Sequence, residues 1–122
     1  MITPGRVNLE DEMIEVTSTI DVSVSATTAW DLVGGFDNLP LWLPLIERSI
    51  LEEGGRLRRL TTQDGALIAE RLQSYDAQAL NYTYTYIDGP DPVENYRGMV
   101  AVTALGSAHC RVSWGSQFTP VG

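Results

Sequence analysis

Hydrophobic and polar positions first alternate along this chain with a period of two and then, briefly, follow the period of a helix. Between Met13 and Val24, isoleucine and valine alternate with threonine, serine and aspartate, which predicts a β-strand. Ser25 is a favourable helix N-cap. The apolar residues after it fall three or four positions apart until Gly34 and Gly35, so we expect one short amphipathic helix here.

A second short helix is predicted next, with Asp37 or Asn38 as its cap, Pro40 in its first turn and Pro44 just beyond its end. The remainder reads as strands of about ten residues separated by turn signals, a spacing typical of an antiparallel meander. The pattern therefore predicts an α+β domain with one curved antiparallel sheet of about seven strands. After the first strand, we expect the others near 46–53, 56–62, 66–75, 79–87, 93–104 and 108–118.

Turn chemistry predicts which side chains share a face. Gln63-Asp64-Gly65 suits a three-residue hairpin loop with glycine in the left-handed position. That loop pairs Thr62 with Ala66, Leu60 with Ile68 and Arg58 with Glu70. A similar hairpin about Gly106 pairs Val102 with Cys110, Val100 with Val112, Gly98 with Trp114 and Tyr96 with Ser116.

The face that these pairs share is mostly apolar, with a few polar groups, which is typical of a small-molecule pocket. Tyr82, Tyr84 and Tyr86 follow one another at period two, and Gly98 leaves room for their rings or for a ligand. Glu70 and Arg58 are the charged members of the face. They fit either a polar anchor or general acid/base inside the pocket, or an ion pair at its rim.

Composition narrows the class of protein. The chain has 122 residues, 8 arginines with no lysine, and 16 acidic residues, so its net charge is −8. Because phosphate-backbone binding needs a basic face, we expect no nucleic-acid partner. No apolar run is long enough to span a membrane. A single cysteine and an N-terminus without signal-peptide character predict a cytoplasmic domain.

Candidate chemistry is otherwise sparse. His109 is the only histidine, and strand alternation directs it away from Cys110, which we expect to be a small buried hydrophobe. We find no phosphate-binding glycine loop and no metal-ligand spacing, so no metal and no cofactor are predicted.

Several segments carry a resemblance to a known family. They are VSVSATTAWDLVGGFDNLPLWLP at 22–44, GRLRRLTTQDG at 55–65, AERL at 69–72, LNYTYTYIDGPDPVENYRG at 80–98 and RVSWGSQFTP at 111–120. In order and spacing, the chain resembles the START-like, or Bet v 1-like, helix-grip superfamily (SRPBCC), specifically its polyketide cyclase/dehydrase and lipid-transport group. The resemblance covers nearly everything from Met13 to Pro120.

The resemblance implies a flexible tail at 1–12 and a ligand-binding domain at 13–122. Glu70 and Tyr96 would line a cavity, with 63–65 and 88–93 as flaps over its mouth. Leu43 stands where abscisic-acid receptors of this fold use a lysine to hold a carboxylate, which favours an apolar or neutral ligand. The ligand-binding residues predicted from pattern and resemblance together are Leu43, Leu60, Ile68, Glu70, Tyr82, Tyr84, Tyr86, Tyr96, Gly98, Trp114 and Phe118.

The family closes its cavity with a long C-terminal helix, and this sequence ends before one, so we expect an uncovered sheet face and a possible homodimer through it. Three functions remain open. The first is a carrier or sensor of a hydrophobic, aromatic or polycyclic small molecule. The second is a polyketide cyclase/dehydratase-type enzyme using Glu70, Arg58 or a tyrosine as catalytic groups. The third is a protein-interaction module that uses the open face.

Overall fold

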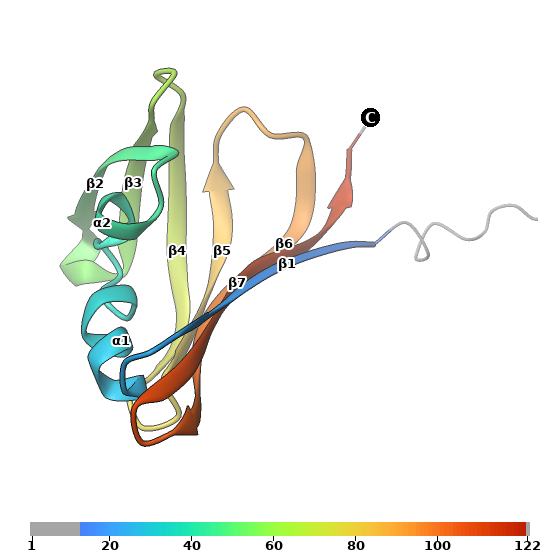
Figure 1. Cartoon of the computed structure of the whole chain (residues 1–122). Helices are drawn as coiled ribbons and strands as arrows, with labels where there is room; N and C mark the ends of the chain where they lie inside the picture. Colours follow the sequence, from blue (N-terminus) through green and yellow to red (C-terminus); the bar gives the residue numbers. More distant parts are fainter. Residues whose placement is uncertain (1–12, 122) are drawn as a thin grey trace, which may run out of the picture.

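The computed structural model describes residues 13–121, which form a curved antiparallel sheet with two short helices against its concave face (Figure 1). This is the predicted α+β helix-grip arrangement, and no long helix follows the last strand within 13–121. The predicted flexible tail, 1–12, lies outside the described residues. No helix in this part of the chain is long and apolar enough to cross a membrane. The elements are β1 (Ile14–Val22), α1 (Ala26–Val33), α2 (Leu39–Trp42), β2 (Ile46–Glu52), a 3₁₀ turn (Glu53–Gly55), β3 (Leu57–Thr62), β4 (Leu67–Asp76), β5 (Asn81–Asp88), β6 (Val93–Gly106) and β7 (His109–Pro120).

The seven strands lie in the order β1-β7-β6-β5-β4-β3-β2. All strands after β1 pair with their neighbours in sequence, and β1 pairs antiparallel with β7 on the far side of the sheet. The segment that carries both helices therefore crosses the concave face from one edge strand to the other, which places α1 and α2 over the sheet (Figure 1).

The β3–β4 hairpin confirms the predicted register. Leu60 pairs with Ile68 and Arg58 pairs with Glu70. Gly65 has φ +90°, the left-handed conformation that the predicted three-residue loop requires. Because the turn fixes this register locally, Arg58 and Glu70 are direct cross-strand neighbours on the concave face.

The register predicted for β6 and β7 is wrong by two residues. Val102 pairs with Val112, and Gly98 pairs with Ser116 rather than with Trp114. The physical reason is a tighter turn, in which Gly106 pairs with His109, together with a register shift between Ala104 and Gly106. Because the error is an even number of residues, the predicted faces of both strands are unchanged.

One half of the concave face is a packed core beneath α1. Ser25 caps this helix by accepting a hydrogen bond from the Thr28 amide at 3.2 Å. Cys110 is fully buried, as predicted, and its neighbour His109 is exposed. The apolar face of α1 packs with Phe36 on the strands, in a cluster of Ala26, Ala29, Trp30, Val33, Phe36, Tyr82, Val100, Val102, Cys110 and Val112.

Candidate ligand-binding site

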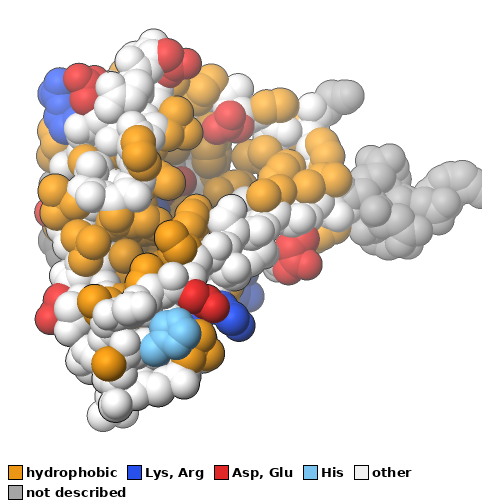
Figure 2. All heavy atoms as spheres, in the orientation of Figure 1, with side chains coloured by type: hydrophobic (Ala, Val, Ile, Leu, Met, Phe, Trp, Pro, Cys, Tyr) orange, Lys and Arg blue, Asp and Glu red, His pale blue; other side chains and the backbone are white. Residues whose placement is uncertain are grey.

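A cavity of about 490 Å³ lies on the concave face, between the α2 region and the half of the sheet nearest the β5–β6 loop. We call it the anchor cavity. Figure 2 shows hydrophobic side chains gathered in the hollow between the helical side and the long strands. Its lining is Leu39, Trp42, Leu43, Leu45, Ile46, Leu60, Ile68, Glu70, Tyr84, Tyr86, Asp91, Pro92, Val93, Tyr96, Val100, Trp114, Phe118 and Pro120.

A buried ion pair lies in the wall of this cavity. The Arg58 side chain is fully buried, and its Nε donates a hydrogen bond to Glu70 Oε1 at 2.9 Å. Arg58 Nη2 lies 2.8 Å from the same oxygen, within ion-pair distance. Its Nη1 donates to the Phe36 carbonyl at 2.8 Å and to the Tyr82 hydroxyl at 3.1 Å. These contacts direct the whole guanidinium toward protein atoms.

Aromatic rings complete the surroundings of this arginine. The guanidinium carbon lies 4.2 Å from the ring centroid of Phe36 and 4.5 Å from that of Tyr84, which are cation–π distances. Arg58 is not among the residues that line the cavity. In this geometry Arg58, which was predicted as a catalytic group together with Glu70, contacts Glu70 and lies behind the cavity wall.

Glu70 presents one free oxygen to the cavity. Only 6% of the residue is exposed, and Oε1 takes both contacts from Arg58. Oε2 accepts no hydrogen bond from residues 13–121, and it is not one of their fully enclosed unpartnered atoms. Since Glu70 lines the cavity, a molecule bound there would meet this free oxygen.

Burial dominates the electrostatics here. It raises the pKa of the Glu70 carboxyl, an effect that the Arg58 charge opposes and the Asp91 charge reinforces. Burial also raises the pKa of the Tyr84 hydroxyl well above its ordinary value, and it raises that of Tyr96. Both phenols are therefore neutral at physiological pH.

Tyr96 lines the cavity from β6, on the same alternating face as Val100, and a bulge lies beside it. Asn95 has φ +53°, and the β6–β7 register shifts between Glu94 and Arg97. The Thr85 hydroxyl donates to the Tyr96 carbonyl at 3.1 Å. The Tyr96 ring then stacks on Phe118, with centroids 6.0 Å apart. Strand alternation alone does not reveal this bulge.

The two predicted flaps lie at the same end of the sheet (Figure 1). In the β5–β6 loop, the Tyr86 hydroxyl donates to Asp91 Oδ2 at 3.0 Å and accepts from the Asp91 amide at 2.9 Å. Gly89 has φ +157°, and a Cβ there would lie 2.0 Å from the Tyr86 hydroxyl oxygen. Gln63, in the other flap, donates its backbone N–H to the Leu45 carbonyl at 2.9 Å. Both loops are thus tied to the cavity walls.

The structure brings most of the predicted site residues together. Tyr82 and Gly98 do not line the cavity: Tyr82 is fully buried behind it, and Gly98 lies against the Tyr84 ring. The predicted residues that line it are Leu43, Leu60, Ile68, Glu70, Tyr84, Tyr86, Tyr96, Trp114 and Phe118.

Sequence reasoning missed other lining residues. Trp42 lines the cavity from the end of α2 and meets Trp114 edge to face at 5.5 Å between centroids. Its apolar neighbours Leu39 and Leu43 line the cavity as well, a spacing that could have identified this face of the short helix. Asp91 lies within the predicted flap at 88–93, but it was not predicted as a lining residue, because its place depends on the conformation of the β5–β6 loop.

Comparison with known proteins identifies the family of this chain. The family described as polyketide cyclase/dehydrase and lipid transport matches residues 13–122. An uncharacterised protein from Bacillus thuringiensis is 39% identical, with a TM-score of 0.85 over 89% of this chain and 80% of its own. The protein XoxI from Bacillus cereus is 40% identical, with a TM-score of 0.85 over 88% of this chain and 76% of its own.

More distant structures share the fold. An aromatase/cyclase from Streptomyces is 19% identical, with a TM-score of 0.76 over 90% of this chain and 70% of its own. No curated protein matches the chain. The match over nearly all described residues and the two Bacillus structures establish that this chain belongs to the polyketide cyclase/dehydrase and lipid-transport family of START-like proteins.

Proposed function

We propose that this chain binds a small hydrophobic molecule with an aromatic or polycyclic body in the anchor cavity, as a carrier or sensor. The observation that carries the proposal is the free Oε2 of the buried Glu70 within an aromatic wall. Because this oxygen is reachable from the cavity and lies in a largely apolar wall, a ligand donor would form a strong hydrogen bond with it. The cavity volume, about 490 Å³, also lies within the usual range for small-molecule sites.

Blocking the cavity tests this proposal. Leu43 lines it, whereas Leu41 on the same short helix is 69% exposed and lies outside the lining. We expect naphthylmethanol, a neutral aromatic probe, to bind the unaltered chain in isothermal titration calorimetry. Leu43→Trp should abolish that binding, and the matched control Leu41→Trp should leave it unchanged. Equal binding by both variants would place the ligand elsewhere.

A cyclase/dehydratase activity is the second candidate, and the same oxygen favours it. In an intramolecular aldol closure, a carboxylate could take a proton from the carbon next to one carbonyl. The resulting enolate would attack a second carbonyl, and the proton would return to the new alkoxide to give a hydroxyl. The carboxylate would then take a second proton from the same carbon and pass it to that hydroxyl, which leaves as water while a carbon–carbon double bond forms. Glu70 Oε2 is free to exchange such a proton, whereas Arg58 has no contact with the cavity.

Turnover separates the two candidates. Mass spectrometry of a linear poly-β-keto thioester incubated with the protein would show loss of one water if the chain is a cyclase/dehydratase. Glu70→Gln should abolish that product and only weaken binding. Binding without any product would leave the carrier or sensor function.

A further inference from the structure

The charges around the anchor cavity are unbalanced. Two carboxylates line it, Glu70 and Asp91, and both lie close enough for the Asp91 charge to act on Glu70. Arg58 is the cation in contact with this wall, and it neutralises one of them. With Glu70 ionised, the two carboxylates and Arg58 leave one net negative charge beside a largely apolar lining.

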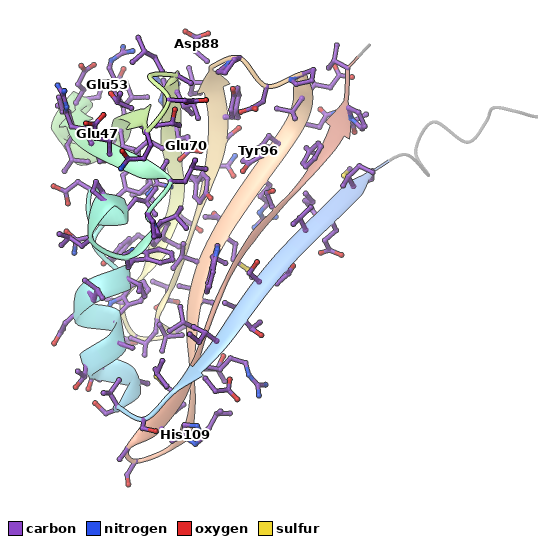
Figure 3. All side chains as sticks on the ribbon, turned by 45° about the horizontal axis from the view of Figure 1, so that its top comes forward. Glu47, Glu53, Glu70, Asp88, Tyr96 and His109 are labelled. Atoms are coloured by element: carbon purple, nitrogen blue, oxygen red, sulfur yellow. The ribbon has the colours of Figure 1, made fainter. Side chains whose placement is uncertain are left out.

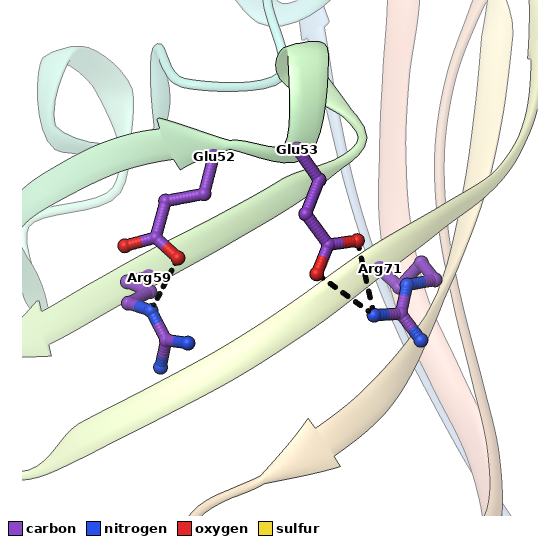
Figure 4. A network of polar contacts seen from close by, with 4 residues as sticks. All are labelled: Glu52, Glu53, Arg59 and Arg71. Carbon is purple, nitrogen blue, oxygen red and sulfur yellow. Dashed lines mark hydrogen bonds and ion pairs between the residues drawn. The ribbon is translucent and has the colours of Figure 1, made fainter.

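Other basic groups of the described chain do not correct this imbalance. Arg59 and Arg71 each follow an inward residue of the buried pair along β3 and β4, and so lie on the outer face. There Arg59 pairs with Glu52 and Arg71 pairs with Glu53 (Figure 4). Arg111 pairs with Asp21 at 2.7 Å. His109 lies at the opposite end of the sheet from Glu70 (Figure 3). Neither these side chains nor Arg48, Arg56 and Arg97, the remaining basic residues of 13–121, line the cavity.

The aromatic wall favours the same kind of guest. Six rings line the cavity around the carboxylate, from Trp42, Tyr84, Tyr86, Tyr96, Trp114 and Phe118. The faces of such rings are negative and attract cations, most of all in a desolvated site. A buried carboxylate oxygen without a donor is the matching acceptor for an N–H of an ammonium group.

We propose that the anchor cavity selects a monocationic amine with an aromatic body, and that Glu70 Oε2 accepts a hydrogen bond from the ammonium group. This inference rests on the proposed ligand-binding function and narrows it. It differs from the apolar or neutral ligand that Leu43 favours in the sequence. The absence of a lysine there disfavours only a ligand carboxylate, whereas the two carboxylates in the lining also favour a cation. A ligand carboxylate would add a second uncompensated negative charge and is excluded.

Three probes that share one ring system test the selection. They are naphthalenes that carry an aminomethyl, a hydroxymethyl or a carboxylate group, titrated by calorimetry at one pH and one ionic strength. We expect the amine to bind about tenfold or more tightly than the alcohol, which is the scale of a charge-assisted hydrogen bond. The carboxylate should show no measurable binding.

The outcomes separate the two proposals. Equal binding of amine and alcohol, or binding of the carboxylate, would overturn the charge selection and leave the cavity as the binding site. No binding by any probe would overturn both proposals. The expected order supports both.

Variants then assign the selection to named groups. Glu70→Gln should bring the amine-to-alcohol affinity ratio close to one, and the exposed Glu47→Gln should leave it unchanged. Asp91→Asn should lower the ratio about two- to threefold because Asp91 is exposed to screening solvent, with Asp88→Asn in the same loop as the control. Each ratio is measured within one variant, so a partly unfolded fraction cancels. An unchanged ratio in Glu70→Gln would overturn the assignment.

Discussion

Two hollows lie next to each other on the concave face, separated by the edge-to-face pair of Trp42 and Trp114. The anchor cavity has a volume of about 490 Å³, and the second hollow, which we call the apolar groove, about 550 Å³. The groove holds no charged side chain and lies between α1 and the β1–β7 edge. Its lining is Ile20, Val22, Val24, Thr28, Ala29, Leu32, Val33, Trp42, Val112 and Trp114.

The two hollows have similar volumes, so volume alone does not identify the recognition site on this sheet. Both hollows can accept apolar surface, which contributes about 25 cal/mol per Å² without regard to orientation. The anchor cavity adds a buried acceptor held by Arg58, and such a group orients a ligand and rejects those that cannot satisfy it.

Breaking the wall between the hollows should have the largest effect. Trp114→Ala removes a large ring from both linings, and we expect a loss of about 3 kcal/mol of unfolding free energy, at the low end for such a truncation because the ring is partly exposed. Urea denaturation measures the loss. Probe affinity for the anchor cavity should fall as well, and a variant with unchanged affinity would mean that this wall does not define the site.

Removing the charge of Glu70 should cause the next largest loss of unfolding free energy. Glu70→Gln leaves the buried, charged Arg58 with neutral acceptors and no carboxylate partner, so we expect a loss of about 3 kcal/mol of unfolding free energy. Glu53→Gln breaks the exposed pair with Arg71 and should cost less than about 1 kcal/mol (Figure 4). Thermal and urea denaturation measure both losses. Equal losses in the two variants would contradict the claim that the buried pair contributes more to stability than the exposed pair.

Filling the space behind Tyr84 should have an intermediate effect. A Cβ at Gly98 would lie 2.1 Å from the Tyr84 Cζ, so Gly98→Ala must push the ring toward the cavity. We expect a loss of about 1–3 kcal/mol of unfolding free energy and weaker probe binding. Gly106→Ala is the matched control on the same strand, because its Cβ would meet no atom within 4 Å. Tight probe binding by Gly98→Ala would show that Tyr84 does not shape the cavity.

Releasing the β5–β6 flap should have the smallest effect. Tyr86→Phe removes two hydrogen bonds to Asp91 near the surface, and we expect a loss of about 1 kcal/mol. The Asp91 amide should then exchange its hydrogen faster, while the amides of the α1 core keep their protection. Unchanged exchange at Asp91 would show that another contact holds this flap.

Local signals explain which features the sequence could predict. Gly65 sets the β3–β4 turn, so the pairing of Arg58 with Glu70 follows from a few neighbouring residues. The predicted β6–β7 register is wrong because this hairpin has both a tighter turn and a register shift near Leu105. Because the register error is two residues, each side chain of β6 and β7 stays on its predicted face, and the predicted inward residues of both strands are unchanged.

Other parts of the site depend on contacts between distant residues. Trp42 meets Trp114 only because α2 crosses the sheet, and no local pattern encodes that distance. Asp91 reaches the cavity only through a loop fixed by Tyr86 and Gly89. The strand pattern identified Glu70 as an inward charge, whereas its free oxygen required the geometry of the Arg58 side chain.

The central claim is that ligands bind in the anchor cavity and not in the equally large apolar groove. The most direct test is a titration of ¹⁵N-labelled protein with aminomethylnaphthalene, followed by amide chemical shifts. Binding in the anchor cavity should give saturable shifts around Glu70, Tyr84 and Tyr96 and leave the α1 residues Thr28 and Leu32 unmoved. Shifts confined to α1 and β1 would contradict it and place recognition in the groove.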